Sequence, residues 1–216
     1  MNDHIKIVVV DDQNISRGFF EMYVMSSKNY ELVGSLRYAK DVVDFVEKHD
    51  VDLVILDIMM QEGIDGLMAA KSIKAKFPRI KIILTTSTAE TRWENEARKI
   101  GAESFWYKEY DHRSLIDMMD LTMQGQHVYP DAAPEVHFGN IKRSDLTQRE
   151  LDVLRELTAS LTNEEIGERL CISPYTVKRH IQNMMDKTGF TSRLELAIHA
   201  KALGLVVSEE VKKRHN

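Results

Sequence analysis

Three aspartates stand where apolar segments of the chain end. The segment "IKIVVV" (5–10) runs into Asp11 and Asp12, and "VDLVILD" ends in Asp57. If both segments are strands of one parallel sheet, their carboxyl ends meet at the same edge and bring the three carboxylates together. Unpaired, such carboxylates raise one another's pKa values and cost stability, a conflict that a hard divalent cation with oxygen ligands resolves. The spacing therefore predicts a Mg²⁺ site.

Two more apolar segments end in groups that complement these acids. Thr86 closes "IKIILTT", and Lys108 follows "SFWY". Carboxylates, a hydroxyl and an ammonium group at one edge suit a phosphoryl group, because the metal ion and the lysine neutralise its charge while the hydroxyl donates to it. A single aspartate or lysine at a strand end is most often only solvated, so the prediction of phosphoryl chemistry rests on the whole set.

An alternation of strands and helices must position these groups. Residues 1–124 contain short β-rich apolar runs separated by helix-like stretches, which predicts βαβ units and a parallel sheet covered on both faces. The expected strands are 5–10, 31–36, 51–57, 80–86 and 104–107, and the expected helices are 14–27, 39–48, 66–76, 89–100 and 112–124. The predicted fold of this part is a doubly wound, flavodoxin-like α/β domain of five parallel strands, with its ligand site beyond their carboxyl ends.

The rest of the chain has a different pattern. Residues 125–143 hold two of the four prolines and two glycines without clear periodicity, and we interpret them as a linker. Residues 144–216 predict an all-α domain of four short helices. Their expected starts are three capping boxes and one serine before a proline: Thr147–Glu150, Thr162–Glu165, Ser192–Glu195 and Ser173–Pro174.

The stretch "SPYTVKRHIQNMMDKTG" predicts the second helix of a helix-turn-helix, the one that enters the major groove. Its apolar residues form one stripe for burial: Val177, Ile181, Met184 and Met185. The polar residues expected on DNA are Lys178, Arg179 and Gln182 for base edges, and Thr176 and Lys187 for phosphates. An ordinary amphipathic surface helix would show a similar pattern, so the spacing alone leaves both interpretations open.

The composition is that of a globular protein, with 216 residues, 43% of them apolar, 29% charged and a net charge of −5. Residues 141–216 carry 13 basic and 11 acidic residues, and this local positive balance favours a nucleic-acid partner. The longest apolar stretches are too short to cross a membrane, and no signal peptide is expected. One cysteine, Cys171, excludes an internal disulfide and favours the cytoplasm.

Residues 1–124 resemble the receiver domain of response regulators, in which a histidine kinase donates phosphate to an aspartate. The resemblance implies these roles: Asp57 as phosphoacceptor, Asp11, Asp12, Asp57 and the carbonyl of Met59 as Mg²⁺ ligands, Thr86 as switch hydroxyl, Lys108 as the phosphate-binding lysine, and Phe105 as aromatic switch. Departures from the family pattern are Gln61 and Glu109 where proline is frequent, a loop to Gly66 that is one residue longer, and Thr85 as a second candidate beside Thr86.

The stretch "LTQRELDVLRELTASLTNEEIGERLCISPYTVKRHIQNMMDKTG" is similar to the LuxR-type four-helix DNA-binding domain nearly end to end. It shares the "LTxRE" opening, the "NxEIxxxL" helix and the "TVKxHxxN" recognition helix. A receiver followed by this domain is the NarL/FixJ architecture. The resemblance implies a transcription regulator rather than an enzyme, which accepts phosphate from a sensor histidine kinase and binds promoter DNA, as a homodimer when active.

Two rival functions belong to other classes. An aspartyl-phosphate phosphohydrolase also uses strand-end aspartates and Mg²⁺, but it normally has a "DxD" nucleophile motif on the first strand and a cap domain, and this sequence shows neither. A DNA-binding protein whose receiver is never phosphorylated, and serves only as a dimerisation module, would keep the same architecture. The longer loop after Asp57 leaves that alternative open.

Overall fold

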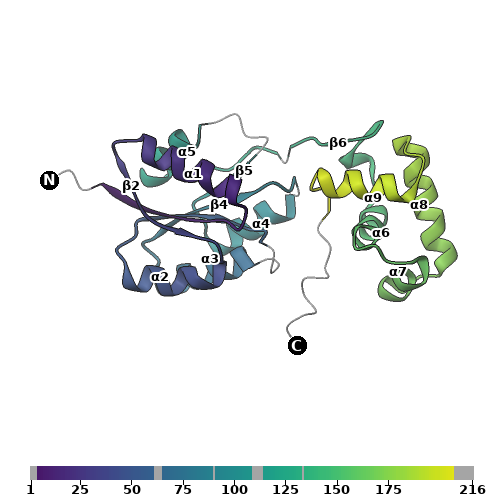
Figure 1. The fold of residues 1–216 in the computed structure, drawn as a ribbon, viewed down its shortest axis with the longest axis horizontal. Coiled ribbons are helices and arrows are strands. Elements are labelled where there is room, and N and C mark those ends of the chain that lie inside the picture. Colours follow the sequence, from purple (N-terminus) through teal and green to yellow (C-terminus); the bar gives the residue numbers. More distant parts are fainter. Residues whose placement is uncertain (1–3, 61–64, 90, 109–113, 133, 207–216) are drawn as a thin grey trace. The chain divides into compact units, whose positions relative to one another are not determined.

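The computed structural model describes residues 4–60, 65–89, 91–108, 114–132 and 134–206 (Figure 1). The chain divides into two compact units, Met1–Ala133 and Pro134–Asn216. The division falls inside the segment predicted as linker, residues 125–143. Gln61 and Glu109, where the sequence departs from the receiver pattern, lie outside the described residues.

The first unit is built on one five-stranded parallel sheet with the order β2-β1-β3-β4-β5. Its strands are β1 (Ile5–Val10), β2 (Tyr30–Leu36), β3 (Leu53–Asp57), β4 (Lys81–Thr86) and β5 (Ser104–Tyr107). Its helices are α1 (Asn14–Ser26), α2 (Val42–Lys48, after a 3₁₀ turn at Ala39–Asp41), α3 (Asp65–Lys76), α4 (Thr91–Ile100) and α5 (Leu115–Met123). Figure 1 shows α1 and α5 on one face of the sheet and α2 and α3 on the other. The predicted doubly wound fold is confirmed.

The central strands are apolar in their interiors because helices cover both of their faces. Every residue of β3 is buried, and so are the last four residues of β1. On one face, Phe20 of α1 and Met118 of α5 belong to the same core cluster as Trp106 of β5. Phe20 and Trp106 meet edge to face, with ring centroids 5.7 Å apart. Burial on both faces fixes the position of the strand ends that carry the polar groups.

The strand register places those ends at one edge of the sheet. Val10 is the register partner of Leu56, so that Asp11 and Asp57 follow neighbouring positions. Asp57 is in turn the partner of Thr85, and Thr86 is the partner of Tyr107. The segments that end in Asp11, Asp57, Thr86 and Lys108 therefore finish side by side, as predicted.

The second unit contains the four helices α6 (Gln148–Thr158), α7 (Asn163–Leu170), α8 (Pro174–Thr188) and α9 (Arg193–Ala202). The capping boxes at Thr147 and Thr162 are complete, and the Ser173 hydroxyl caps α8 with Pro174 in its first turn. The predicted box at Ser192 is only half formed, because the Glu195 carboxylate accepts from the N–H and hydroxyl of Thr191 instead.

A short hairpin precedes these helices and was not predicted. Strands β6 (His137–Phe138) and β7 (Ile141–Lys142) pair antiparallel around Gly139 and Asn140. Phe138 is buried against Phe190, with ring centroids 5.1 Å apart, and the Asn140 N–H donates to the carbonyl of Thr188 at 2.9 Å. A Gly-Asn pair between apolar residues is a known hairpin signal, so the sequence contained the information.

Candidate functional site

Three carboxylates converge beyond β1 and β3. Asp11, Asp12 and Asp57 are 0%, 6% and 2% exposed, and each places a carboxylate oxygen within 4.8 Å of the others. Water cannot surround groups that are buried this deeply, so their charge must be balanced by neighbouring cations. The structure therefore brings together the three acids that the sequence predicted would meet.

Lys108 supplies one of those cations. Its Nζ lies 2.7 Å from Oδ2 of Asp11 and 3.1 Å from Oδ2 of Asp57, and its side chain is 8% exposed. Burial raises the pKa of Asp57 to about 7; Asp11 adds to this effect, and Lys108 opposes it. Burial lowers the pKa of Lys108, but Asp57 and Asp11 outweigh it, so the net pKa is raised. One ammonium cannot balance three converging carboxylates, and a divalent cation would supply the missing positive charge.

Residues at the start of α1, from the N-cap residue Gln13 onward, hold Asp11 in place. Ser16 donates its hydroxyl to Oδ2 at 2.5 Å, and the Gln13 N–H donates to Oδ1 at 2.8 Å. Arg17 donates to the backbone carbonyl of Asp11 at 2.8 Å. Both carboxylate oxygens of Asp11 are thus engaged within the protein. Ser16 was not predicted as a site residue. The available signal was its position in the first turn of the helix that follows Asp11 and Asp12.

The two threonines at the end of β4 are both fully buried. Thr86 Oγ1 accepts from the N–H of Thr88 at 3.0 Å. Thr85 Oγ1 has no hydrogen-bond partner among the residues that the structure describes. Met59 is half-buried after β3, and its N–H points to Oδ1 of Asp57 at 3.4 Å. The roles assigned to Thr86 and to the Met59 carbonyl by resemblance stay predictions.

Replacing Asp12 by asparagine is expected to raise the melting temperature of the metal-free protein by about 2–5 °C, because one of the mutually repelling buried charges is removed. The same change is expected to weaken Mg²⁺ binding at least about tenfold, since a charged ligand becomes neutral. Thermal unfolding in a chelator and a Mg²⁺ titration followed by Trp fluorescence measure both effects. Asp44→Asn, at an exposed position on α2, is the control. Unchanged Mg²⁺ affinity in Asp12→Asn would contradict the ligand assignment.

The recognition helix predicted from the sequence is α8. Its buried side is Val177, Ile181 and Met184, with Met185 half-buried. Lys178, Arg179 and Gln182 are exposed on the other side, and Thr176 is half-buried beside Ser173. Gln182 donates to the carboxylate of Asp186 at 2.8 Å. The exposed face thus carries the three side chains expected to read base edges.

Lys187, unlike the other predicted DNA contacts, forms an ion pair with another helix of the same unit. Its Nζ is 2.8 Å from both carboxylate oxygens of Glu150, a side chain of α6 that is 4% exposed. Glu150 also accepts from the N–H and hydroxyl of Thr147. Lys187 therefore ties the end of α8 to the start of α6, and the predicted phosphate contact competes with this ion pair.

The comparisons with known proteins agree with this architecture. The family model described as response regulator receiver domain matches residues 7–120, and the model described as bacterial regulatory proteins, luxR family, matches residues 144–200. Among the described residues, no helix is long and apolar enough to span a membrane. The chain belongs to the response regulators and combines a receiver domain with a LuxR-type domain.

Individual relatives extend over nearly the whole chain. The response regulator protein VraR of Staphylococcus epidermidis is 28% identical over 201 residues, which are 91% of this chain and 96% of that protein. The same protein of Staphylococcus aureus gives the same identity and coverage. A structure of the RcsB response regulator of Salmonella typhimurium is 20% identical with a TM-score of 0.55, and the match covers 92% of this chain and 99% of that chain. A second RcsB structure, bound to promoter P1flhDC with a phosphomimetic, matches with 19% identity and a TM-score of 0.55, over 93% of this chain and 100% of that chain. At these identities the structures establish the fold.

Proposed function

We propose that this protein is a phosphorylation-dependent transcription regulator of the cytoplasm, which accepts a phosphoryl group on Asp57 from a sensor histidine kinase and binds promoter DNA as a dimer. One observation carries the proposal: the buried carboxylates of Asp11, Asp12 and Asp57 meet at one edge of the sheet with the ammonium of Lys108 among them. Three buried carboxylates beside a single ammonium are costly without a further cation, and carboxylates, a lysine and a divalent cation together suit transfer of a phosphoryl group to an aspartate.

Phosphoryl transfer requires that the Asp57 carboxylate form a new P–O bond while the P–N bond to the kinase histidine breaks and its electron pair returns to the imidazole. Lys108 Nζ, already 3.1 Å from Asp57, neutralises a phosphoryl oxygen, and the Thr86 hydroxyl donates to another. Mg²⁺, held by the three aspartates and the Met59 carbonyl, would supply the remaining positive charge. The movement of Thr86 and Lys108 toward the phosphate shifts the adjoining segments and Phe105, which biases a two-state equilibrium.

The DNA-binding part of the proposal rests on α8, whose exposed face presents Lys178, Arg179 and Gln182. One related structure is described as two RcsB dimers bound to two parallel DNAs. A small domain with little net positive charge binds DNA weakly alone, so we infer that two copies bind two half-sites about one helical turn apart. Leu194 and Ile198 on α9 are 66% and 56% exposed and are candidates for the dimer contact.

The experiment that tests the proposal is incubation with a small phosphodonor and Mg²⁺, followed by phosphate-affinity electrophoresis and a DNA-binding titration. Wild type is expected to shift on the gel and bind DNA more tightly, whereas Asp57→Ala does neither. A wild type that stays unshifted would favour the rival in which the receiver only dimerises. Release of inorganic phosphate from phosphomonoesters in repeated turnovers would favour the phosphohydrolase.

Met59→Asn is expected to shorten the lifetime of phospho-Asp57 several-fold. Met59 is two residues beyond the acceptor and half-buried, so its apolar side chain hinders the water that attacks the phosphoryl group, whereas asparagine can orient that water by hydrogen bonding. The decay of the shifted band after removal of the phosphodonor measures the lifetime. Met68→Asn, at a methionine of α3 that is 72% exposed, is the control. An unchanged decay constant in Met59→Asn would contradict the shielding by Met59.

A further inference from the structure

The segment after α5 lies along the outer edge of β5. Val128 pairs with Ser104 in a parallel bridge, its carbonyl accepts from the Phe105 N–H at 2.9 Å, and its own N–H donates to the Glu103 carbonyl at 3.2 Å. β5 is the last strand in the sheet order, so this edge would otherwise present unpaired backbone groups. Val128 is 5% exposed. We name residues 127–129 the strap.

Tyr129 fastens the strap over Phe105. The two rings are stacked, with centroids 6.2 Å apart and planes 16° apart. The Tyr129 hydroxyl donates to the carbonyl of Ala102 at 2.8 Å, and the guanidinium of Arg98 on α4 lies 3.8 Å from the Tyr129 ring centroid. Phe105 is fully buried, and Tyr129 is part of its cover. Phe105 therefore cannot move without changing its contacts with the strap.

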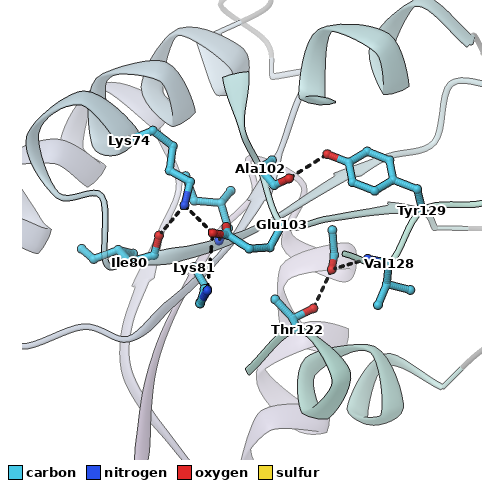
Figure 2. Close-up of polar contacts among 10 residues, drawn as sticks. Lys74, Ile80, Lys81, Ala102, Glu103, Thr122, Val128 and Tyr129 are labelled. Carbon is cyan, nitrogen blue, oxygen red and sulfur yellow. Dashed lines mark hydrogen bonds and ion pairs between the residues drawn. The ribbon is translucent and has the colours of Figure 1, made fainter. Parts of the chain in front are cut away.

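The two sides of β5 are held by different forces (Figure 2). Toward β4 and α3, the Glu103 carboxylate binds the Lys74 ammonium at 2.6 Å and the Ile82 N–H at 2.9 Å. Separating such a buried ion pair is expensive. On the outer side, the strap is held by backbone hydrogen bonds, by the hydroxyls of Tyr129 and Ser104 and by ring contacts. These contacts are individually small and are opposed by the entropy of ordering the segment. The strap is thus the neighbour of β5 that can detach.

The strap also determines the length of the tether between the units. Gln126 is bonded to the end of α5 through its N–H and the Leu121 carbonyl, and Val136 is bonded within the second unit through its carbonyl and the Arg143 N–H. With the strap in place the tether is residues 130–135, six residues; with the strap released it is residues 127–135, nine residues. Three more residues add roughly 10 Å of reach.

We propose that the strap docks on β5 in the unphosphorylated protein and is released when Phe105 moves, which lengthens the tether and frees the DNA-binding unit to dimerise on DNA. This regulation rests on the proposed function, in which phosphorylation of Asp57 moves Phe105. Docked and released forms constitute a two-state equilibrium, and phosphorylation shifts it by disfavouring the ring contact that holds the docked form.

Substitution of Tyr129 tests the strap without any phosphate. Tyr129→Ala is expected to raise the affinity of the unphosphorylated protein about 3- to 10-fold for a duplex enriched from a random pool by the wild type. His127→Ala, at an exposed strap position, is expected to leave it unchanged. Tyr129→Phe keeps the stacking on Phe105 but loses the hydrogen bond to Ala102. Its DNA affinity is expected to lie between those of Tyr129→Ala and His127→Ala. Equal affinities for Tyr129→Ala and His127→Ala, with both proteins folded by circular dichroism at the assay temperature, would overturn the proposal.

Hydrogen exchange in the wild type tests the coupling to phosphorylation. The Phe105 and Val128 amides, protected by the strap bonds, are expected to exchange about tenfold faster once the phosphodonor and Mg²⁺ are added. Unchanged protection in protein whose intact mass shows the phosphoryl group would overturn the release step. If no phosphoryl mass appears on Asp57, the proposed function fails, and the comparison of Tyr129→Ala with His127→Ala still decides whether the strap restrains DNA binding.

Discussion

Lys108→Ala is expected to slow phosphoryl uptake by Asp57 about 100- to 1,000-fold, the loss that follows removal of one preorganised donor to developing negative charge. The Lys108 ammonium lies 3.1 Å from Asp57 and its side chain is 8% exposed, so bulk water cannot fully replace it. The initial rate with a small phosphodonor and saturating Mg²⁺, followed by phosphate-affinity electrophoresis, measures the change.

Lys99→Ala is the matched control for Lys108→Ala. Lys99 forms an exposed ion pair with Glu96 on α4, so its removal changes the net charge equally and is expected to leave the rate as in wild type. Circular dichroism establishes that both variants are folded. If Lys108→Ala is folded and its rate lies within about threefold of wild type, Lys108 has no part in the transfer.

The second large effect is expected on the affinity for DNA. Arg179→Ala should lose about 1–3 kcal/mol of binding free energy on the enriched duplex and relax the preference at one base pair, because an exposed arginine of α8 is placed to bind a base edge bidentately. Titrations of phosphorylated protein against the enriched duplex and against random DNA, at several salt concentrations, separate base reading from phosphate contacts.

Lys201→Ala is the control: it removes the same charge from α9, outside the recognition helix. It is expected to weaken binding to the enriched duplex and to random DNA slightly and equally. An equal loss on enriched and random DNA for Arg179→Ala would mean that Arg179 contacts only phosphates. The salt dependence supports this distinction, because each lost phosphate contact lowers the slope by about one.

The fold of the first unit and the assembly of its acidic site were predictable because they follow from local patterns. Continuous apolar runs predict doubly covered strands, and in a parallel sheet the residues that end such runs, Asp57 and Lys108 among them, must share an edge. The start of α8 followed from the Ser173 cap and Pro174, and its buried stripe followed from periodicity. Both signals act within a few residues of the chain.

Features that depend on distant partners were not predictable in this way. Lys187 of α8 pairs with Glu150 of α6, a residue 37 positions earlier in the chain. Periodicity within α8 could not reveal this partner, and it placed Lys187 on the flank that faces DNA. Likewise, Val128 forms a bridge to β5 from a segment without periodicity, and nothing in its own sequence specifies the edge that it covers. Ser16 was missed because a serine in a first helical turn is ordinarily only a helix residue.

The position of Lys108 in the chain has a consequence for the order of assembly. Its ammonium neutralises Asp11, 97 positions earlier, and Asp57, which lies on the third strand. At roughly 5–20 residues per second of translation, several seconds pass between the synthesis of the acids and that of the lysine. During that interval the nascent sheet carries clustered negative charge without its internal cation. Insertion of β5 is therefore the step that completes both the sheet and the charge balance.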